Sequence, residues 1–266
     1  MFKGFFRLPA GEPSRDNICV PPQFSAESLR FLRALKRNND REWFRARRDQ
    51  YDRVVRGPMI AVIEQLALDF RRFAPEIMSS PKLSLYRVYR DTRFSPDKSP
   101  LKTHVSASFR WRGLPKGGAA GLYLEVTPRW VWMGGGFYSP EPQHLVRIRT
   151  HISDTYPEIR RLAQNATFKK VLGTLDGDRL TRLPRGYAAD DPAAEFLKYK
   201  YFLVGREFPP AFATTAGFYP AVVQTFKAAM PLVRFLNEPL VAEGLDTGTL
   251  LSHPKNQPRI TTDERR

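Results

Sequence analysis

Apolar residues recur at helical spacing through the first seventy residues of the chain. Ser25 is placed to cap the first helix, which is predicted to end at Asn38-Asn39. Two further helices are predicted, one over Arg41–Arg56 and one from Pro58, since proline is well tolerated in a first helical turn. The apolar stripe of that third helix consists of Met59, Val62, Ile63, Leu66 and Phe70. The pattern therefore predicts a three-helix unit.

The period then changes from helical to alternating. Strands are predicted over Leu83–Tyr89 and Lys102–Arg110, followed by a hairpin of Leu122–Thr127 and Trp130–Tyr138. One face of the second strand carries Thr103, Val105, Ala107 and Phe109, and the other carries Lys102, His104, Ser106, Ser108 and Arg110. In the hairpin, Leu122, Leu124, Val126, Val131 and Met133 share one face, and Tyr123, Glu125, Trp130 and Trp132 share the other. Because no helix separates these strands, we expect a mainly antiparallel sheet.

Helical spacing returns in the second half of the chain. Helices are predicted over Pro140–Asp154, Pro157–Gln164, Pro192–Tyr199 and Gly217–Leu236, with Pro231 kinking or splitting the last, and a strand over Tyr201–Phe208. The predicted fold class is α+β, in which the N-terminal three-helix unit and the C-terminal helices pack on the sheet. We expect residues 1–23 to form an extended arm, 24–240 a single domain, and 241–266 a flexible tail.

Composition narrows the class of protein. Hydrophobic residues make up 42% of the chain, which is ordinary for a globular protein. No window approaches the ~18 consecutive apolar residues of a membrane-spanning helix, and the charged opening from Met1 to Arg7 does not resemble a secretion signal. Cys19 is the single cysteine, which excludes an internal disulfide and a cysteine-based metal cage. These features predict a cytoplasmic protein without a membrane partner.

Positive charge is concentrated in one part of the chain. The formal net charge is +16, and residues 81–116 alone hold 9 basic and 2 acidic residues. Such a concentration attracts phosphate or carboxylate groups, although a charge run is more often a solubilising surface.

The stretch Arg87–His104 is the candidate site. The guanidinium fork of arginine matches phosphate and carboxylate oxygens, and a strand running into a loop can bring several cations together. We expect a phosphate-bearing ligand to be bound by Arg87, Arg90, Asp91, Arg93, Lys98 and Lys102. The catalytic candidates are His104, as an acid or base, and Asp97. In the alternative interpretation, Arg90–Asp91 and Asp97–Lys98 are ion pairs that only fix the loop.

The same stretch resembles the R-x-x-R-D-x-R-F-x-x-D-K-x-x-x-K signature of the bacterial domain-of-unknown-function family 2461. The resemblance extends from Phe24 to about Leu240. It includes the segment from Asn38 to Phe44, the glycines Gly134-Gly135-Gly136, and the segment from Leu183 to Tyr187. The resemblance implies no particular activity. Where the family usually has tyrosine, this chain has Leu101, so we do not expect a catalytic hydroxyl there.

Other patterns give weaker signals. The arginines of Arg41–Arg56 interleave with aromatic residues, as on nucleic-acid-binding surfaces, although they also fit a solvated helix face. His144 and His151 lie too far apart along a helix to hold one ion, and no metal or cofactor is predicted. Two function classes remain open, an enzyme acting on a small phosphorylated substrate and a nucleic-acid-binding module. The oligomeric state is not predicted.

Overall fold

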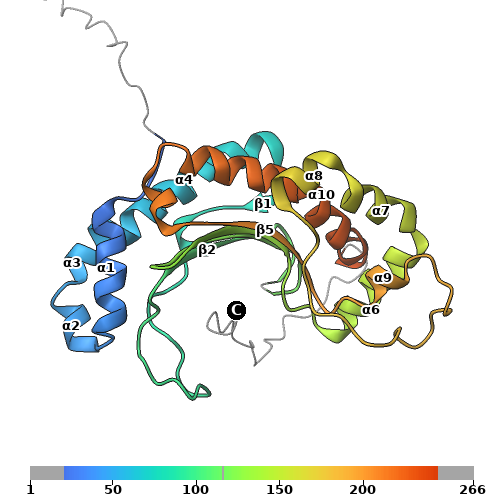
Figure 1. Ribbon diagram of the computed structural model, residues 1–266, viewed down its shortest axis with the longest axis horizontal. Coiled ribbons are helices and arrows are strands. Elements are labelled where there is room, and N and C mark those ends of the chain that lie inside the picture. The colour runs from blue at the N-terminus through green and yellow to red at the C-terminus, as the bar shows by residue number, and fades with distance from the viewer. Residues whose placement is uncertain (1–20, 116, 245–266) are drawn as a thin grey trace, which may run out of the picture.

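The computed structural model describes residues 21–115 and 117–244. Helices cover one face of a curved antiparallel sheet, and the other face is concave (Figure 1). The fold class is α+β, as predicted. Among the residues described, none of the helices combines the length and apolar character needed to cross a lipid bilayer. Cys19, most of the predicted arm and residues 245–266 lie outside the described residues.

The N-terminal unit begins where the sequence predicts. Ser25 and Ser28 form a reciprocal cap, in which the Ser25 hydroxyl accepts from the Ser28 amide at 3.2 Å and the Ser25 amide donates to the Ser28 hydroxyl at 2.9 Å. The elements of this unit are α1 (Ala26–Arg37), α2 (Arg41–Arg45), α3 (Arg48–Tyr51), the π-helical turn η1 (Asp52–Arg56) and α4 (Gly57–Phe73). Asp40 caps α2 through the amides of Glu42 and Trp43, at 2.8 and 2.9 Å.

The predicted helix Arg41–Arg56 is not continuous. It is broken at Arg47, which has the non-helical torsion angles φ −124° and ψ 19°. Its last turn is π-helical, and the amide of Gly57 donates to the carbonyl of Asp52, five residues earlier. Pro58 has no amide hydrogen with which to continue the α-helical hydrogen-bond pattern. This missing donor explains why the chain forms the wider π-helical turn before Pro58.

Five strands form the sheet in chain order, each antiparallel to the next. They are β1 (Ile77–Met78), β2 (Val105–Trp111), β3 (Gly121–Val126), β4 (Val131–Phe137) and β5 (Phe202–Phe208). The predicted strand Leu83–Tyr89 is wrong in its first part, because Ser80 caps a short helix, α5 (Pro81–Ser84). The rest of the predicted strand forms two isolated β-bridges. Leu85 pairs with Ala107 on β2, and Tyr89 pairs with Leu101, which precedes β2.

The two faces of the sheet carry the residues that alternation predicts. Phe109 lies among the helices, with its ring centroid 5.4 Å from that of Phe70 on α4 and 5.5 Å from that of Phe226 on the last helix. Pairing of Glu125 with Ser106 and with Trp132 places all three on the opposite, concave face.

The C-terminal half supplies the remaining helices. They are α6 (Pro142–Asp154), α7 (Tyr156–Gln164), α8 (Ala166–Leu172), α9 (Ala194–Leu197), the 3-10 turn η2 (Pro210–Thr214) and α10 (Phe218–Gly244). The sequence did not predict α8. Pro231 does not split the last helix, since α10 continues through Pro231 and Pro239. Its buried stripe, which includes Phe226 and Val233, packs on the sheet and offsets the missing hydrogen bonds.

Two asparagine side chains attach strands to helices in the same way. Asn39, between α1 and α2, accepts from the Leu101 amide at 3.0 Å and donates to the Leu101 carbonyl at 2.9 Å. Asn237 on α10, fully buried, accepts from the Ala120 amide at 2.8 Å and donates to the Ala120 carbonyl at 3.0 Å. Leu101 precedes β2 and Ala120 precedes β3, so the two attachments lie at opposite ends of this strand pair.

Candidate functional site

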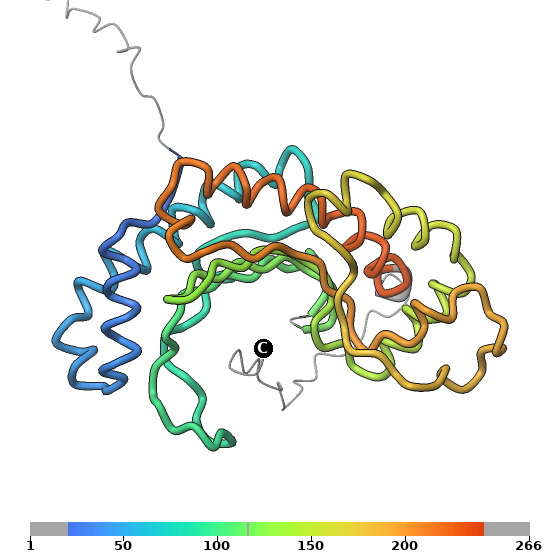
Figure 2. Tube along the Cα trace, viewed as in Figure 1, coloured from blue at the N-terminus to red at the C-terminus, as the bar shows by residue number. Residues whose placement is uncertain are grey.

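The stretch Arg87–His104 forms a hairpin that extends from the sheet. The Arg90 amide donates to the Pro100 carbonyl at 2.9 Å, and the Lys102 amide donates to the Val88 carbonyl at 2.8 Å. Figure 2 shows this hairpin leaving the concave side of the sheet beside α1 and α2. The edge-to-face contact of Phe44 with Tyr89, at 6.0 Å between ring centroids, joins the hairpin to α2. The hairpin is therefore held from the N-terminal helices as well as from the sheet.

Charged residues at the hairpin tip are paired with one another. Arg90 contacts the Asp97 carboxylate, and its Nη1 lies 2.5 Å from the Ser99 hydroxyl. Arg93 binds Asp91 at 2.9 Å. The sequence interpretation chose different pairs, Arg90–Asp91 and Asp97–Lys98, because it could not anticipate how the loop turns back.

Local hydrogen bonds also determine the protonation of the tip. The Ser99 amide donates to Asp97 at 2.8 Å. This bond, the Ser99 hydroxyl and the Arg90 guanidinium lower the pKa of the Asp97 carboxyl to about 2. Lys98 donates to the Thr92 carbonyl at 3.1 Å. Asp97 thus stays ionised, while its side chain is 58% exposed and held by Arg90 and Ser99.

Three of the predicted residues lie close enough to affect one another electrostatically. Burial lowers the pKa of His104 to about 4, and the Lys102 and Arg90 charges lower it further. The Lys102 ammonium lies 4.6 Å from the centroid of the Tyr86 ring. Arg87 is exposed, and Arg93 and Lys98 belong to the tip. The structure therefore brings Arg90, Lys102 and His104 together and leaves the other predicted cations apart from them.

A buried hydrogen-bond network lies on the concave face, around Glu125 of β3. Glu125, which is 5% exposed, accepts from Trp130 Nε1 at 2.8 Å and from the Tyr123 hydroxyl at 3.1 Å. Burial raises the pKa of the Glu125 carboxyl above its ordinary value, against the lowering effect of these two hydrogen bonds. Ser106 is the direct cross-strand neighbour of Glu125. The predicted strand Lys102–Arg110 is wrong in its first part, since β2 begins at Val105 and His104 lies in the bend before it.

This network was not among the predicted site residues. The alternation of the hairpin had placed Tyr123, Glu125, Trp130 and Trp132 together on one face. The register confirms this for Tyr123, Glu125 and Trp132, and Trp130, which precedes β4, reaches Glu125 through its indole N–H. The signal that could have found the site was a glutamate in an otherwise aromatic face of a central strand, because a buried carboxyl needs dedicated donors.

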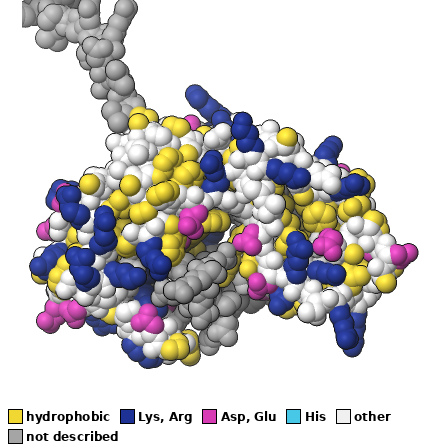
Figure 3. All heavy atoms as spheres, in the orientation of Figure 1, with side chains coloured by type: hydrophobic (Ala, Val, Ile, Leu, Met, Phe, Trp, Pro, Cys, Tyr) yellow, Lys and Arg dark blue, Asp and Glu magenta, His cyan; other side chains and the backbone are white. Residues whose placement is uncertain are grey.

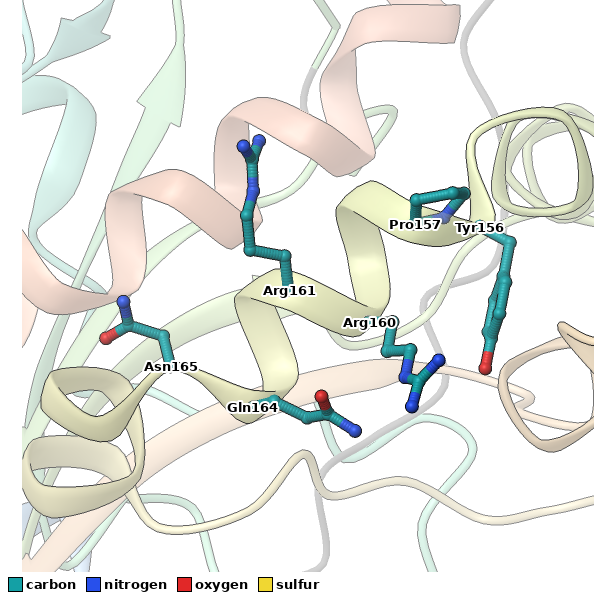
Figure 4. Close-up of a pocket in the computed structure, with 6 residues that line it drawn as sticks. All are labelled: Tyr156, Pro157, Arg160, Arg161, Gln164 and Asn165. Carbon is teal, nitrogen blue, oxygen red and sulfur yellow. The ribbon is translucent and has the colours of Figure 1, made fainter.

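A separate pocket lies along α7, from its first residue to Asn165, the residue before α8 (Figure 4). It has a volume of about 510 Å³ and is lined by Tyr156, Pro157, Arg160, Arg161, Gln164 and Asn165. In Figure 4, Arg160 and Arg161 extend to opposite sides of α7. The two cations do not converge on one point, so this pocket is a weaker candidate for an anion.

Basic side chains also gather over the lobe formed by α1 to η1 (Figure 3). Several of these are partnered: Arg48 binds Asp52 at 2.8 Å, and Arg53 binds Glu27 at 3.2 Å. Arg47 lies over the ring of Trp43, 4.6 Å from its centroid. These contacts are typical of a solvated helix surface.

The described part of the chain holds no cluster of three or more histidine, cysteine, aspartate or glutamate side chains that could bind a metal ion. His144 lies beside Phe137, and His151 lies 4.5 Å from the ring centroid of Phe235. Phe137 is the last residue of β4 and Phe235 lies on α10, so each histidine packs against an aromatic side chain.

Comparison with known proteins identifies the family. No curated protein and no solved structure matches the chain. The family model described as "Conserved hypothetical protein (DUF2461)" matches residues 27–235. This range includes the hairpin, the Asn39 attachment and the whole concave face, and the chain therefore belongs to the DUF2461 family.

Proposed function

We propose that this protein binds a small phosphate-bearing ligand on the concave face of the sheet, between Arg90, Lys102 and His104. The observation that carries the proposal is that Lys102 and Arg90, both on the hairpin, lie close enough to the half-buried His104 to lower the pKa of its imidazole. Arg90 is already paired with Asp97, and a phosphate placed beside His104 could accept charge-assisted hydrogen bonds from Lys102 and from the remaining N–H groups of Arg90.

His104 suits such a ligand in its neutral form. Its pKa of about 4 leaves the imidazole uncharged near neutral pH, with one nitrogen to donate to a phosphate oxygen and one to accept a proton. A neutral imidazole beside two cations is also a suitable general base for a ligand hydroxyl. Asp97 would act indirectly, by positioning Arg90.

Glu125 must be compatible with an anion nearby. An ionised carboxylate one strand away would repel phosphate. Burial raises the Glu125 pKa, which weakens that repulsion, and Lys102 lies close enough to act on the same carboxyl. A bound phosphate is therefore repelled less by Glu125 than it would be by an exposed, fully ionised glutamate.

The test is calorimetric titration of the full chain with inorganic phosphate and with ribose 5-phosphate. Lys102→Gln should weaken binding about 10- to 100-fold, because a hydrogen bond to a charged group contributes about 1.5–3 kcal/mol. Lys98→Gln is the matched control, since it removes the same charge from the same hairpin but outside the site.

Equal losses in both lysine variants would contradict the proposal, because they would indicate general attraction to a basic surface. Binding only of oligonucleotides, lost steeply as salt rises, would favour the nucleic-acid-binding alternative. A further measurement separates these cases: a phosphate bound beside His104 should raise its pKa from about 4, observable in the pH titration of its imidazole signals.

A further inference from the structure

Three aromatic rings form a row across the concave face. The centroids of Tyr86 and Tyr123 are 6.2 Å apart, and those of Tyr123 and Trp132 are 6.0 Å apart. Tyr86 immediately precedes the hairpin, Tyr123 lies on β3 and Trp132 on β4. Lys102 stands over the first ring of this row. The cationic end of the proposed site thus continues into an aromatic floor.

Two glycines let Trp132 lie flat on the sheet. Gly134 and Gly205 are cross-strand partners on β4 and β5. A Cβ atom on Gly134 would come within 2.7 Å of the indole Cη2, and one on Gly205 within 2.5 Å of its Cζ2. The indole therefore covers both glycines with one face. Its other face points away from the sheet, where a planar group can stack on it.

The spacing of the floor suits a nucleotide. Tyr86 pairs beside Ser106 on β2, so Tyr123 and Trp132 lie one and two strands beyond that position. From the ring of Tyr86, which Lys102 contacts, the ring of Tyr123 is 6.2 Å away, and that of Trp132 is a further 6.0 Å from Tyr123. An extended nucleoside monophosphate spans a separation of this order from its phosphate to the far edge of its base.

We infer that the ligand is a nucleoside monophosphate, with its phosphate at Arg90 and Lys102 and its base stacked on Trp132, beside the ring of Tyr123, whose plane is tilted 48° from that of the indole. This inference rests on the proposed phosphate site. A sugar phosphate would use the cations and leave the aromatic floor without a role. A mononucleotide uses both, because every nucleobase has a π-face that stacks on aromatic rings.

The experiment compares ribose 5-phosphate, adenosine 5′-monophosphate and adenosine by calorimetry on the full chain. Stacking of a base on an aromatic side chain contributes an amount that corresponds to about a 5- to 150-fold gain in affinity. We expect the monophosphate to bind tighter than ribose 5-phosphate by a factor in that range, and tighter than adenosine.

Trp132→Leu should remove this gain and leave the affinity for ribose 5-phosphate unchanged. Trp132→Phe should retain most of the gain, because phenylalanine still offers a ring face. Trp43→Leu on α2 is the matched control and should leave the gain intact, since Trp43 packs against Phe31 away from the sheet face. An unchanged ribose 5-phosphate affinity also shows that the Trp132→Leu protein is folded.

The outcomes separate the two proposals. If ribose 5-phosphate binds and the monophosphate binds no tighter, the nucleotide inference is overturned and the phosphate site stands. The inference is also overturned if the gain persists in Trp132→Leu. Absence of binding by both phosphate compounds would overturn the phosphate site and the inference together.

Discussion

The hairpin tip and the concave sheet face differ in how their charged side chains are stabilised. At the tip, Arg90 and Arg93 are paired with carboxylates a few residues away along the chain, and the Asp97 partner is more than half exposed. On the sheet face, His104 and Glu125 are enclosed, and their pKa values move away from their charged forms. A dense run of charges can neutralise itself, whereas a few buried ones change the chemistry of a surface.

Removing the acceptor of the sheet network should have the largest effect. Glu125→Ala leaves the Trp130 indole N–H without its acceptor and removes one of the two side-chain partners of the Tyr123 hydroxyl, which keeps Ser106. We expect a loss of about 2–4 kcal/mol in the free energy of unfolding, because each buried unsatisfied group costs about 1–3 kcal/mol. Glu125→Gln keeps an acceptor and should lose less than about 1 kcal/mol. If urea denaturation showed the same loss of unfolding free energy for Glu125→Ala and Glu125→Gln, the two hydrogen bonds would contribute little to stability.

The pH dependence of stability should come next. Since the folded-state pKa of His104 is lowered from 6.5 to about 4, the unfolded chain takes up its proton first as the pH falls. The stability that neutral His104 contributes is complete above pH 6.5 and is lost down to about pH 4, by about 3 kcal/mol in total.

The control for this effect is His104→Asn, which cannot titrate. Glu125 changes the stability in the opposite direction. Its carboxyl pKa is higher in the folded protein than the ordinary value of 4.5, so protonation of this group stabilises the folded state as the pH falls toward 4.5. The difference between the wild-type and His104→Asn unfolding curves isolates the histidine. Curves that stay parallel between pH 6.5 and pH 4 would show that His104 titrates normally.

Substitutions at the tip should have the smallest effect. Asp97→Asn should cost less than about 1 kcal/mol, because exposed ion pairs contribute about that much or less. Any loss of stability from protonating Asp97 should occur only below pH 3.8, as the pH falls toward its folded-state pKa of about 2. Asp91→Asn should leave thermal unfolding unchanged. Destabilisation at the tip larger than that of Glu125→Ala would reverse the comparison between the two regions.

The sequence predicted the sheet face better than the loop. Alternation is a local property with a period of two, so it correctly placed Tyr123, Glu125 and Trp132 on one face, although it extended β2 back over His104, which lies in the bend before the strand. The pairs at the tip depend on how the loop turns back, and this has no periodic signal. The stacking of Trp132 on two glycines required the register of β4 against β5.

Helix interruptions were difficult to predict for a related reason. Proline at Pro58 and Pro231 gives the same local signal, but the chain changes to a π-helical turn before one and continues as a helix through the other. The burial of α10 against the sheet decides its outcome, and burial of that kind is set by the whole fold.

The two asparagine attachments have a consequence for how the chain can be modified. Asn39 and Asn237 each hold both backbone groups of one residue, at opposite ends of the β2–β3 pair. These hydrogen bonds therefore fix the register of β2 against β3, and the turn that connects the two strands is not needed to fix it. Doubling the length of that turn should cost only about 0.6 kcal/mol of loop entropy. The connection after Trp111 is thus a place where a tag or a small domain could be inserted, and a larger loss of stability on insertion would show that the turn itself sets the register.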